Sequence, residues 1–126
     1  MTRHNTRLAV ALTGVLTTVL TTTLPLQSSF AEGGARRDVV RHEKQNVRDA
    51  IKHATEAVDY GKQGHAEKLV THAEASLQKA LRGGMDPHLG EAITDLKEAI
   101  EHGKAGHADV ATKHAEDAVT HLSQVK

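Results

Sequence analysis

Histidine is the residue type whose abundance and spacing in this sequence could do chemistry. The chain has 126 residues, of which 10 are His, but it has no Cys, no Trp, one Tyr and one Phe. A neutral imidazole offers a nitrogen lone pair to Cu(II), Ni(II) or Zn(II), and carboxylates can complete the coordination shell. Because Cys is absent, the sequence excludes disulfides, thiolate metal sites, iron–sulfur clusters and a Cys nucleophile. Function is therefore to be sought in imidazole and carboxylate groups.

The His residues are spaced so that a helix would line them up with acidic residues. One stripe runs from His88 to His102 at steps of three and four, with acidic residues between, and residues at these steps are neighbours on a helix. Elsewhere His recurs every seven residues, which also keeps it on one side of a helix. The predicted metal ligands are His42, Asp49, His53, Glu56, His65, His72, His88, Glu91, Asp95, Glu98, His102, His107, His114, Asp117 and His121.

Ideal helix geometry predicts where these ligands lie. In the first and third helical segments they fall nearly opposite the apolar stripe, and in the second and fourth they fall on its flank. The ligands are therefore expected outside the core. The pair His102 and His107, which flanks a four-residue turn, is predicted to bind copper most tightly with help from Glu98. His65 and His72 are predicted to be poorer ligands, because Lys68 lies between them and repels a cation.

Charged stripes on helices are commonly no more than solvated surface, and Lys97 and Glu101 fit that interpretation. His fits it poorly, because it is a mediocre helix former and nine of the ten His lie within residues 32–126. The lack of thiolates and the presence of only two Met argue against a Cu(I) site. We therefore predict several sites for divalent ions, with Cu(II) preferred and Ni(II) and Zn(II) as further candidates.

Apolar residues at helical spacing predict four helices that position these ligands, at about 39–60, 65–82, 87–102 and 107–125. The first apolar stripe is expected to begin at Val40. Gly61 and Gly103 are predicted to end helices in the left-handed conformation, and Asp86 and Pro87 to be the N-cap and first residue of the third helix. Short connections make neighbouring helices antiparallel. The predicted fold is an all-α, up-down antiparallel four-helix bundle made of two repeated hairpins.

An internal repeat supports this organisation. Residues 50–80 and 92–122, at an offset of 42, are identical at twelve of thirty-one positions. The clearest shared block is a Gly-Lys-x-Gly-His-Ala turn, which begins at Gly61 and again at Gly103. Repeats of this kind are usually supersecondary units that bury a face against each other.

Residues 1–31 are typical of a cleaved secretory signal peptide. Arg3 and Arg7 precede an uncharged run over residues 8–24, and Ser29 and Ala31 supply small residues at a cleavage site. A transmembrane anchor is the alternative, since the run approaches the roughly 20 residues needed to span a bilayer. Cleavage would leave residues 32–126 as a His-rich metal-binding domain in the periplasm, no longer attached to the membrane.

Other function classes find less support in the sequence. The formal net charge is zero, which gives no electrostatic reason to expect nucleic acid or an anionic membrane as a partner. The sequence has no Ser-His-Asp set, Gly-rich phosphate loop or His-Glu-x-x-His motif, so we predict that the protein is not an enzyme. Each apolar stripe is narrow enough to be used up inside one bundle, so we also predict a monomer. One alternative stays open, a periplasmic interaction or chaperone-like protein whose His residues respond to pH without binding metal.

The His-Ala-x-x-Ala pattern, the doubled turn and the signal-like start resemble the bacterial small metal-binding protein (SmbP) family over residues 42–122. The resemblance implies a monomeric periplasmic four-helix bundle that binds several divalent ions, copper above all, and buffers or scavenges them. By position it assigns ligands in the repeated units and turns, namely His53, His72, His114, His65, His102 and His107. Two positions depart from the pattern and imply fewer or weaker sites. Asp95 stands where the other units have His, and Tyr60 stands where the second turn has His102.

Overall fold

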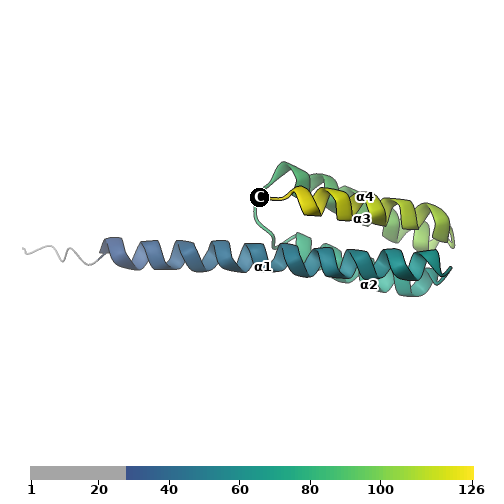
Figure 1. Ribbon diagram of the computed structural model, residues 1–126, viewed down its shortest axis with the longest axis horizontal. Coiled ribbons are helices and arrows are strands. Elements are labelled where there is room, and N and C mark those ends of the chain that lie inside the picture. Colours follow the sequence, from purple (N-terminus) through teal and green to yellow (C-terminus); the bar gives the residue numbers. More distant parts are fainter. Residues whose placement is uncertain (1–27) are drawn as a thin grey trace, which may run out of the picture.

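A computed structural model describes residues 28–126 of the protein, and these form four helices. The helices are α1 (Ser28–Lys62), α2 (Ala66–Ala80), α3 (Pro87–Lys104) and α4 (Ala108–Gln124). They pack as two antiparallel hairpins, α1 with α2 and α3 with α4, and the hairpins lie side by side (Figure 1). Both short turns are at one end of the bundle, and the α2–α3 connection and the C-terminus are at the other. The predicted all-α, up-down bundle is therefore confirmed.

The core is narrow because most of its members are Ala. Ten Ala residues of the described helices are fully buried, and the large side chains with the least exposure are Leu69, Leu89, Leu96 and Leu122. Small side chains let helix backbones approach closely. The buried hydroxyl of Ser76 donates a hydrogen bond of 2.8 Å to the carbonyl oxygen of Ala50, which satisfies a polar group that would otherwise be costly to bury.

The helix boundaries differ from the predicted ones mainly at the start of α1. This helix begins at Ser28, not near residue 39, and its first turns project beyond the bundle (Figure 1). Val40, predicted to open the apolar stripe, is 48% exposed, and the first buried member is Val47. The apolar stripe of α1 begins late because α2 ends before it reaches the first turns of α1. Those turns therefore have no partner helix to cover them.

Glycine conformation corrects a second prediction. Gly61 and Gly103 are buried in the last turns of α1 and α3, and the left-handed residues are Gly64 and Gly106, with φ of 77° and 82°. A Cβ on Gly103 would lie 2.5 Å from a methyl carbon of Val70. Gly61 is equally crowded by Leu69 and by the α4 side chain of Thr112. These two glycines are required for close helix packing and not for helix termination.

Asp86 and Pro87 behave as predicted. The Asp86 side chain accepts a hydrogen bond of 2.9 Å from the backbone N–H of His88, and Pro87 is the first residue of α3. A capping carboxylate satisfies one of the free N–H groups at the helix start. It thereby fixes where α3 begins.

Two ion pairs join the hairpins in equivalent ways. Lys62 of α1 lies 2.9 Å from Glu116 of α4, and Lys104 of α3 lies 2.7 Å from Glu74 of α2. The members of the two pairs are 42 positions apart, the offset of the sequence repeat. Each pair is largely exposed, so it orients the hairpins more than it stabilises them.

The predicted signal peptide falls mostly outside the described residues. The described part of the chain includes the predicted cleavage position after Ala31, which lies in the first turns of α1. None of the four described helices is both long and apolar enough to cross a membrane.

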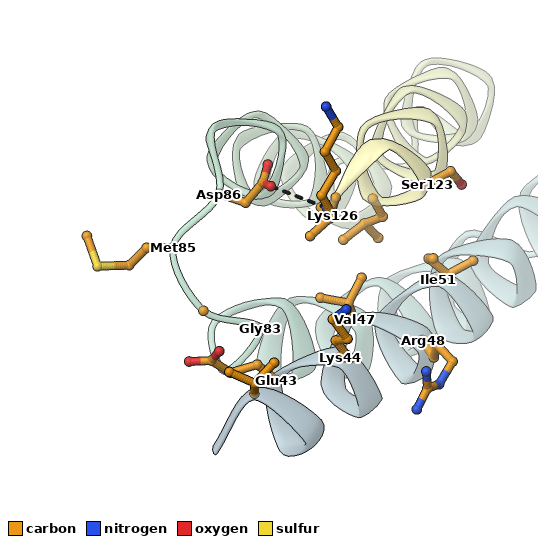
Figure 2. Close-up of a pocket in the computed structure, with 14 residues that line it drawn as sticks. Glu43, Lys44, Val47, Arg48, Ile51, Gly83, Met85, Asp86, Ser123 and Lys126 are labelled. Atoms are coloured by element: carbon orange, nitrogen blue, oxygen red, sulfur yellow. Dashed lines mark hydrogen bonds between the residues drawn. The ribbon is translucent and has the colours of Figure 1, made fainter. Parts of the chain in front are cut away.

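A hollow lies at the end of the bundle opposite the turns. It measures about 300 Å³ and is lined by α1, the α2–α3 connection and the C-terminal residues. Figure 2 shows Val47 and Ile51 of α1 facing the C-terminal segment, while Met85 points away. No His of residues 28–126 lines this hollow, so the chemistry predicted from the sequence must be sought elsewhere.

Candidate metal sites

Three groups of His and acidic side chains converge in the seams between the paired helices of each hairpin. In each group, one possible ligand atom from each of three residues lies within 4.8 Å of the other two. One group lies between α1 and α2, and two lie between α3 and α4. The groups are His53/Glu56/His72, His88/Glu91/His121 and Asp95/Glu98/His114, which we call the first, second and third groups.

The first group is centred on the Glu56 carboxylate. Its Oε2 lies 3.1 Å from His53 Nδ1 on the same helix and 2.9 Å from His72 Nδ1 on the facing helix. The Tyr60 ring stacks on the His72 ring at a centroid distance of 5.0 Å. All three ligand side chains are about one-third exposed, so an ion from solution can reach them.

The second group repeats this arrangement between α3 and α4. Glu91 Oε2 lies 3.1 Å from His88 Nδ1 and 2.9 Å from His121 Nδ1. The Nδ1 atom of His121 is nevertheless buried and makes no hydrogen bond among the described residues. Buried polar atoms normally have a partner. A buried imidazole nitrogen without one, beside a carboxylate and a second imidazole, is the donor arrangement that a divalent ion would complete.

The third group has two carboxylates and one imidazole. Glu98 Oε2 lies 3.0 Å from His114 Nδ1 across the seam, and Asp95 lies one turn before Glu98 on α3. The His102 ring stacks on the His114 ring at 5.4 Å with the planes almost parallel. Oxygen and nitrogen donors in this ratio suit Cu(II), Ni(II) and Zn(II).

The carboxylates of the first and third groups have opposite electrostatic surroundings. Burial raises the pKa of the Glu56 carboxyl, but the hydrogen bond from His53 and the charge of His72 outweigh burial and hold the pKa below its ordinary value. Burial raises the pKa of Asp95; the charges of His121 and His114 lower it and those of Asp117 and Glu98 raise it, so that the pKa lies above its ordinary value. A cation bound beside Asp95 would favour the ionised carboxylate.

Comparison with known families agrees with this geometry. The profile of the family described as small metal-binding protein matches residues 10–125, almost the whole chain. The chain belongs to the small metal-binding protein family. No curated protein matches the sequence closely enough to be counted as a relative. The resemblance predicted from the doubled turn and the His pattern is therefore confirmed, and the matched range includes all three seam groups.

The structure places the predicted ligands of this small metal-binding protein differently from the helix-wheel prediction. The ligands of α1 and α3 were expected nearly opposite the core, but His53, Glu56 and Asp95 are half-buried in the seams. An antiparallel partner covers the flank of each helix, and side chains as long as Glu and His reach across to it. The sites are therefore shared between two helices and not built on one.

Several predicted ligands do not join the three groups. Asp49 was expected beside His53, but its carboxylate lies 3.0 Å from Lys79 Nζ, and this hydrogen bond is the main cause that lowers the Asp49 pKa. Asp117, expected between His114 and His121, is exposed and lies in no group. His42 is exposed on α1, also outside the groups.

The turn pair has a different environment from the one predicted. The rings of His102 and His107 are 6.0 Å apart, so the fold does bring them near each other. Glu98, which was expected to assist them, contacts His114 instead. At the other turn, the His65 ring lies 6.3 Å from the Tyr60 ring. His107 and His65 are exposed and lie outside the three groups.

His72 is better placed than the sequence suggested. Lys68, expected to repel a cation there, extends over the Tyr60 ring with its Nζ 4.9 Å from the ring centroid. The pairing of His72 with Glu56 was not predicted, although the repeat contained a signal for it. Residues at similar distances from a hairpin turn face each other across the seam. On this basis His72 faces His53 and Glu56, just as His114, 42 positions later, faces Asp95 and Glu98.

Proposed function

We propose that the protein binds several divalent transition-metal ions in the seams of its hairpins, with Cu(II) preferred over Ni(II) and Zn(II). The observation that carries this proposal is the convergence of imidazole and carboxylate from two helices at three places, in a chain of the small metal-binding protein family. The preference for Cu(II) rests on the donor set, which has nitrogen and oxygen but no thiolate, and on the position of Cu(II) at the top of the divalent affinity order.

We also propose that the protein is exported and serves to scavenge, buffer or store copper in the periplasm. The order of basic start, uncharged run and small residues within residues 1–31 supports export. The partial exposure of every seam group supports buffering over permanent incorporation, because ions can enter and leave without unfolding the bundle. A binding role without catalysis is consistent with groups that lie in open seams and not in an enclosed cleft.

A copper titration of two triple variants tests the function. The first variant carries His72→Ala, His114→Ala and His121→Ala, which removes the cross-helix imidazole from each group. The matched control carries His42→Ala, His65→Ala and His107→Ala, which removes three His outside the groups. Isothermal titration and electron paramagnetic resonance should show that the first variant loses most high-affinity Cu(II) binding and that the control keeps it. Equal losses in both variants would contradict the assignment of the ligands, and an unaltered protein that binds no Cu(II) would overturn the proposed function itself.

A further inference from the structure

The second and third groups are connected through the imidazole of His121. Its Nδ1 faces Glu91 at 2.9 Å, and its Nε2 lies 3.7 Å from Asp95 Oδ2. Asp95 is itself a member of the third group with Glu98 and His114. One carboxylate therefore lies within reach of ligands of both groups along the α3–α4 seam.

Imidazole chemistry gives this contact a function. A neutral imidazole carries one N–H, so when Nδ1 gives its lone pair to an ion, the proton is on Nε2. Metal-binding His residues usually donate that remaining N–H to a carboxylate, carbonyl or water, which orients the ring and strengthens its lone pair. For His121, Asp95 is the carboxylate that faces Nε2. Asp95 can thus orient a ligand of the second group while it contributes an oxygen to the third.

The position of Asp95 favours this double role. Its side chain is 19% exposed, compared with 54% for Glu91 and 48% for Glu98. The Asp95 carboxylate therefore lies deepest in the seam of the three. The groups that face it from α3 and α4 are Glu98, His114, Asp117 and His121, so no Lys or Arg competes for its oxygens among the groups that affect its charge.

The first hairpin lacks this connection. His53 occupies the place of Asp95, 42 positions earlier, and Lys79 occupies the place of His121. Lys79 is engaged with Asp49 at 3.0 Å. The first group is therefore a single site with an ion pair beside it, whereas the second hairpin has two groups in contact.

We propose that Asp95 couples the second and third groups, so that two metal ions bind to the α3–α4 hairpin with negative coupling while the α1–α2 hairpin binds one ion independently. This inference rests on the proposed metal-binding function. Asp95 acts on the second group as a positioning residue through His121 and on the third group as a ligand. An ion held by Asp95 in the third group makes the carboxylate a weaker acceptor for His121. Because such coupling is reciprocal, the binding of either ion then lowers the affinity of the hairpin for the other ion.

The test isolates the second group. A background variant with His53→Ala, His72→Ala and His114→Ala retains only His88, Glu91 and His121 as a complete group. In that background, Asp95→Asn should weaken Cu(II) binding by about 10–100-fold, the usual effect of removing an outer partner of a metal-binding His. The matched control is Glu98→Gln, which changes the neighbouring carboxylate that does not face His121 and should leave the affinity within about twofold.

A spectroscopic measurement separates positioning from general structural damage. Nitrogen-15 chemical shifts of the His121 ring in the metal-free protein should report the Nε2–H tautomer, and Asp95→Asn should shift the tautomer population while Asp95→Glu restores it. Equal affinities for the Asp95→Asn and Glu98→Gln variants, with the His121 tautomer unchanged, would overturn the coupling. A background variant that binds no Cu(II) before Asp95 is altered would instead count against the proposed function.

Discussion

Glu56 and Asp95 lie about one helical turn apart when the hairpins are aligned by the repeat. Their surroundings nevertheless shift the pKa values of the two carboxyl groups in opposite directions. Glu56 is ionised readily because two imidazoles face it. Asp95 has its pKa raised by burial and by neighbouring negative charge. A buried carboxylate without a fixed positive partner costs stability when ionised. Asp95 is such a group, half-buried in the α3–α4 seam, and the proposed cation site would account for its presence there.

The Asp95→Asn variant should be more stable than the unaltered protein when metal is absent. Since the folded-state pKa of Asp95 lies above its unfolded value, the folded state has its full stability below the unfolded pKa and loses stability as the pH rises through the folded pKa. At pH 7 the carboxylate is ionised and this cost is present, and Asn removes it. Thermal melting with a chelator present should show a small rise in Tm at pH 7 that shrinks as the pH falls towards about 4.

Asp59→Asn is the matched control for this comparison, because Asp59 is exposed on α1. It should leave Tm nearly unchanged, as surface substitutions usually do. A lower Tm for Asp95→Asn at pH 7 would show that the carboxylate stabilises the metal-free fold. The same substitution should still weaken copper binding, so that stability and binding change in opposite directions.

At the scale of helices and hairpins, the sequence predicted the elements better than their contacts. Apolar periodicity, the Asp86 cap and the Gly-Lys-x-Gly-His turns were sufficient to predict four helices and their antiparallel order. The wheel of a single helix could not show that Glu98 contacts His114 and not His102. That choice depends on the level at which the two helices of a hairpin face each other, and a wheel drawn for one helix does not contain that level.

Of the residues that form the groups, those of the second group differ most between the two hairpins. Where α3 and α4 carry His88, Glu91 and His121, the first hairpin has Asn46, Asp49 and Lys79. The Lys79 ammonium bonds to the Asp49 carboxylate at 3.0 Å, so a fixed cation stands where the other hairpin would hold a metal ion. In the first hairpin, the Lys79 ammonium thus supplies the positive charge beside the carboxylate that a bound metal ion would supply in the second group.

The triple substitution Asn46→His, Asp49→Glu and Lys79→His should therefore create a metal site in the first hairpin. Removal of the ammonium frees the carboxylate, and the two added imidazoles supply the donors that the second group has. Isothermal titration should show about one additional Cu(II) bound per chain. Lys97→His, which adds one imidazole at an exposed position of α3, is the control and should add no high-affinity site. An unchanged stoichiometry in the triple variant would show that matching residues are insufficient to transfer the group.

At the scale of the whole molecule, metal binding and folding should support each other. The core is made largely of Ala and four large Leu side chains, and a small domain buries a limited share of its surface. Each group links the two helices of one hairpin, so an ion bound there resists separation of those helices. An ion that binds only the folded state adds about 2.7 kcal/mol to stability when its free concentration is 100 times Kd.

This linkage should disappear as the imidazoles become protonated. Ligating His must be neutral, and its ordinary pKa is about 6.5, so copper affinity should fall between about pH 7 and pH 5. Sites made only of carboxylates would persist to about pH 4. Thermal melting at pH 7 should show a Tm increase of several degrees on addition of Cu(II), with no increase for Mg²⁺, which prefers oxygen donors. At pH 5 the increase should be lost, although circular dichroism shows the helices still formed. A copper-dependent rise in Tm that is equally large at pH 5 would mean that carboxylates, and not the seam imidazoles, hold the ions.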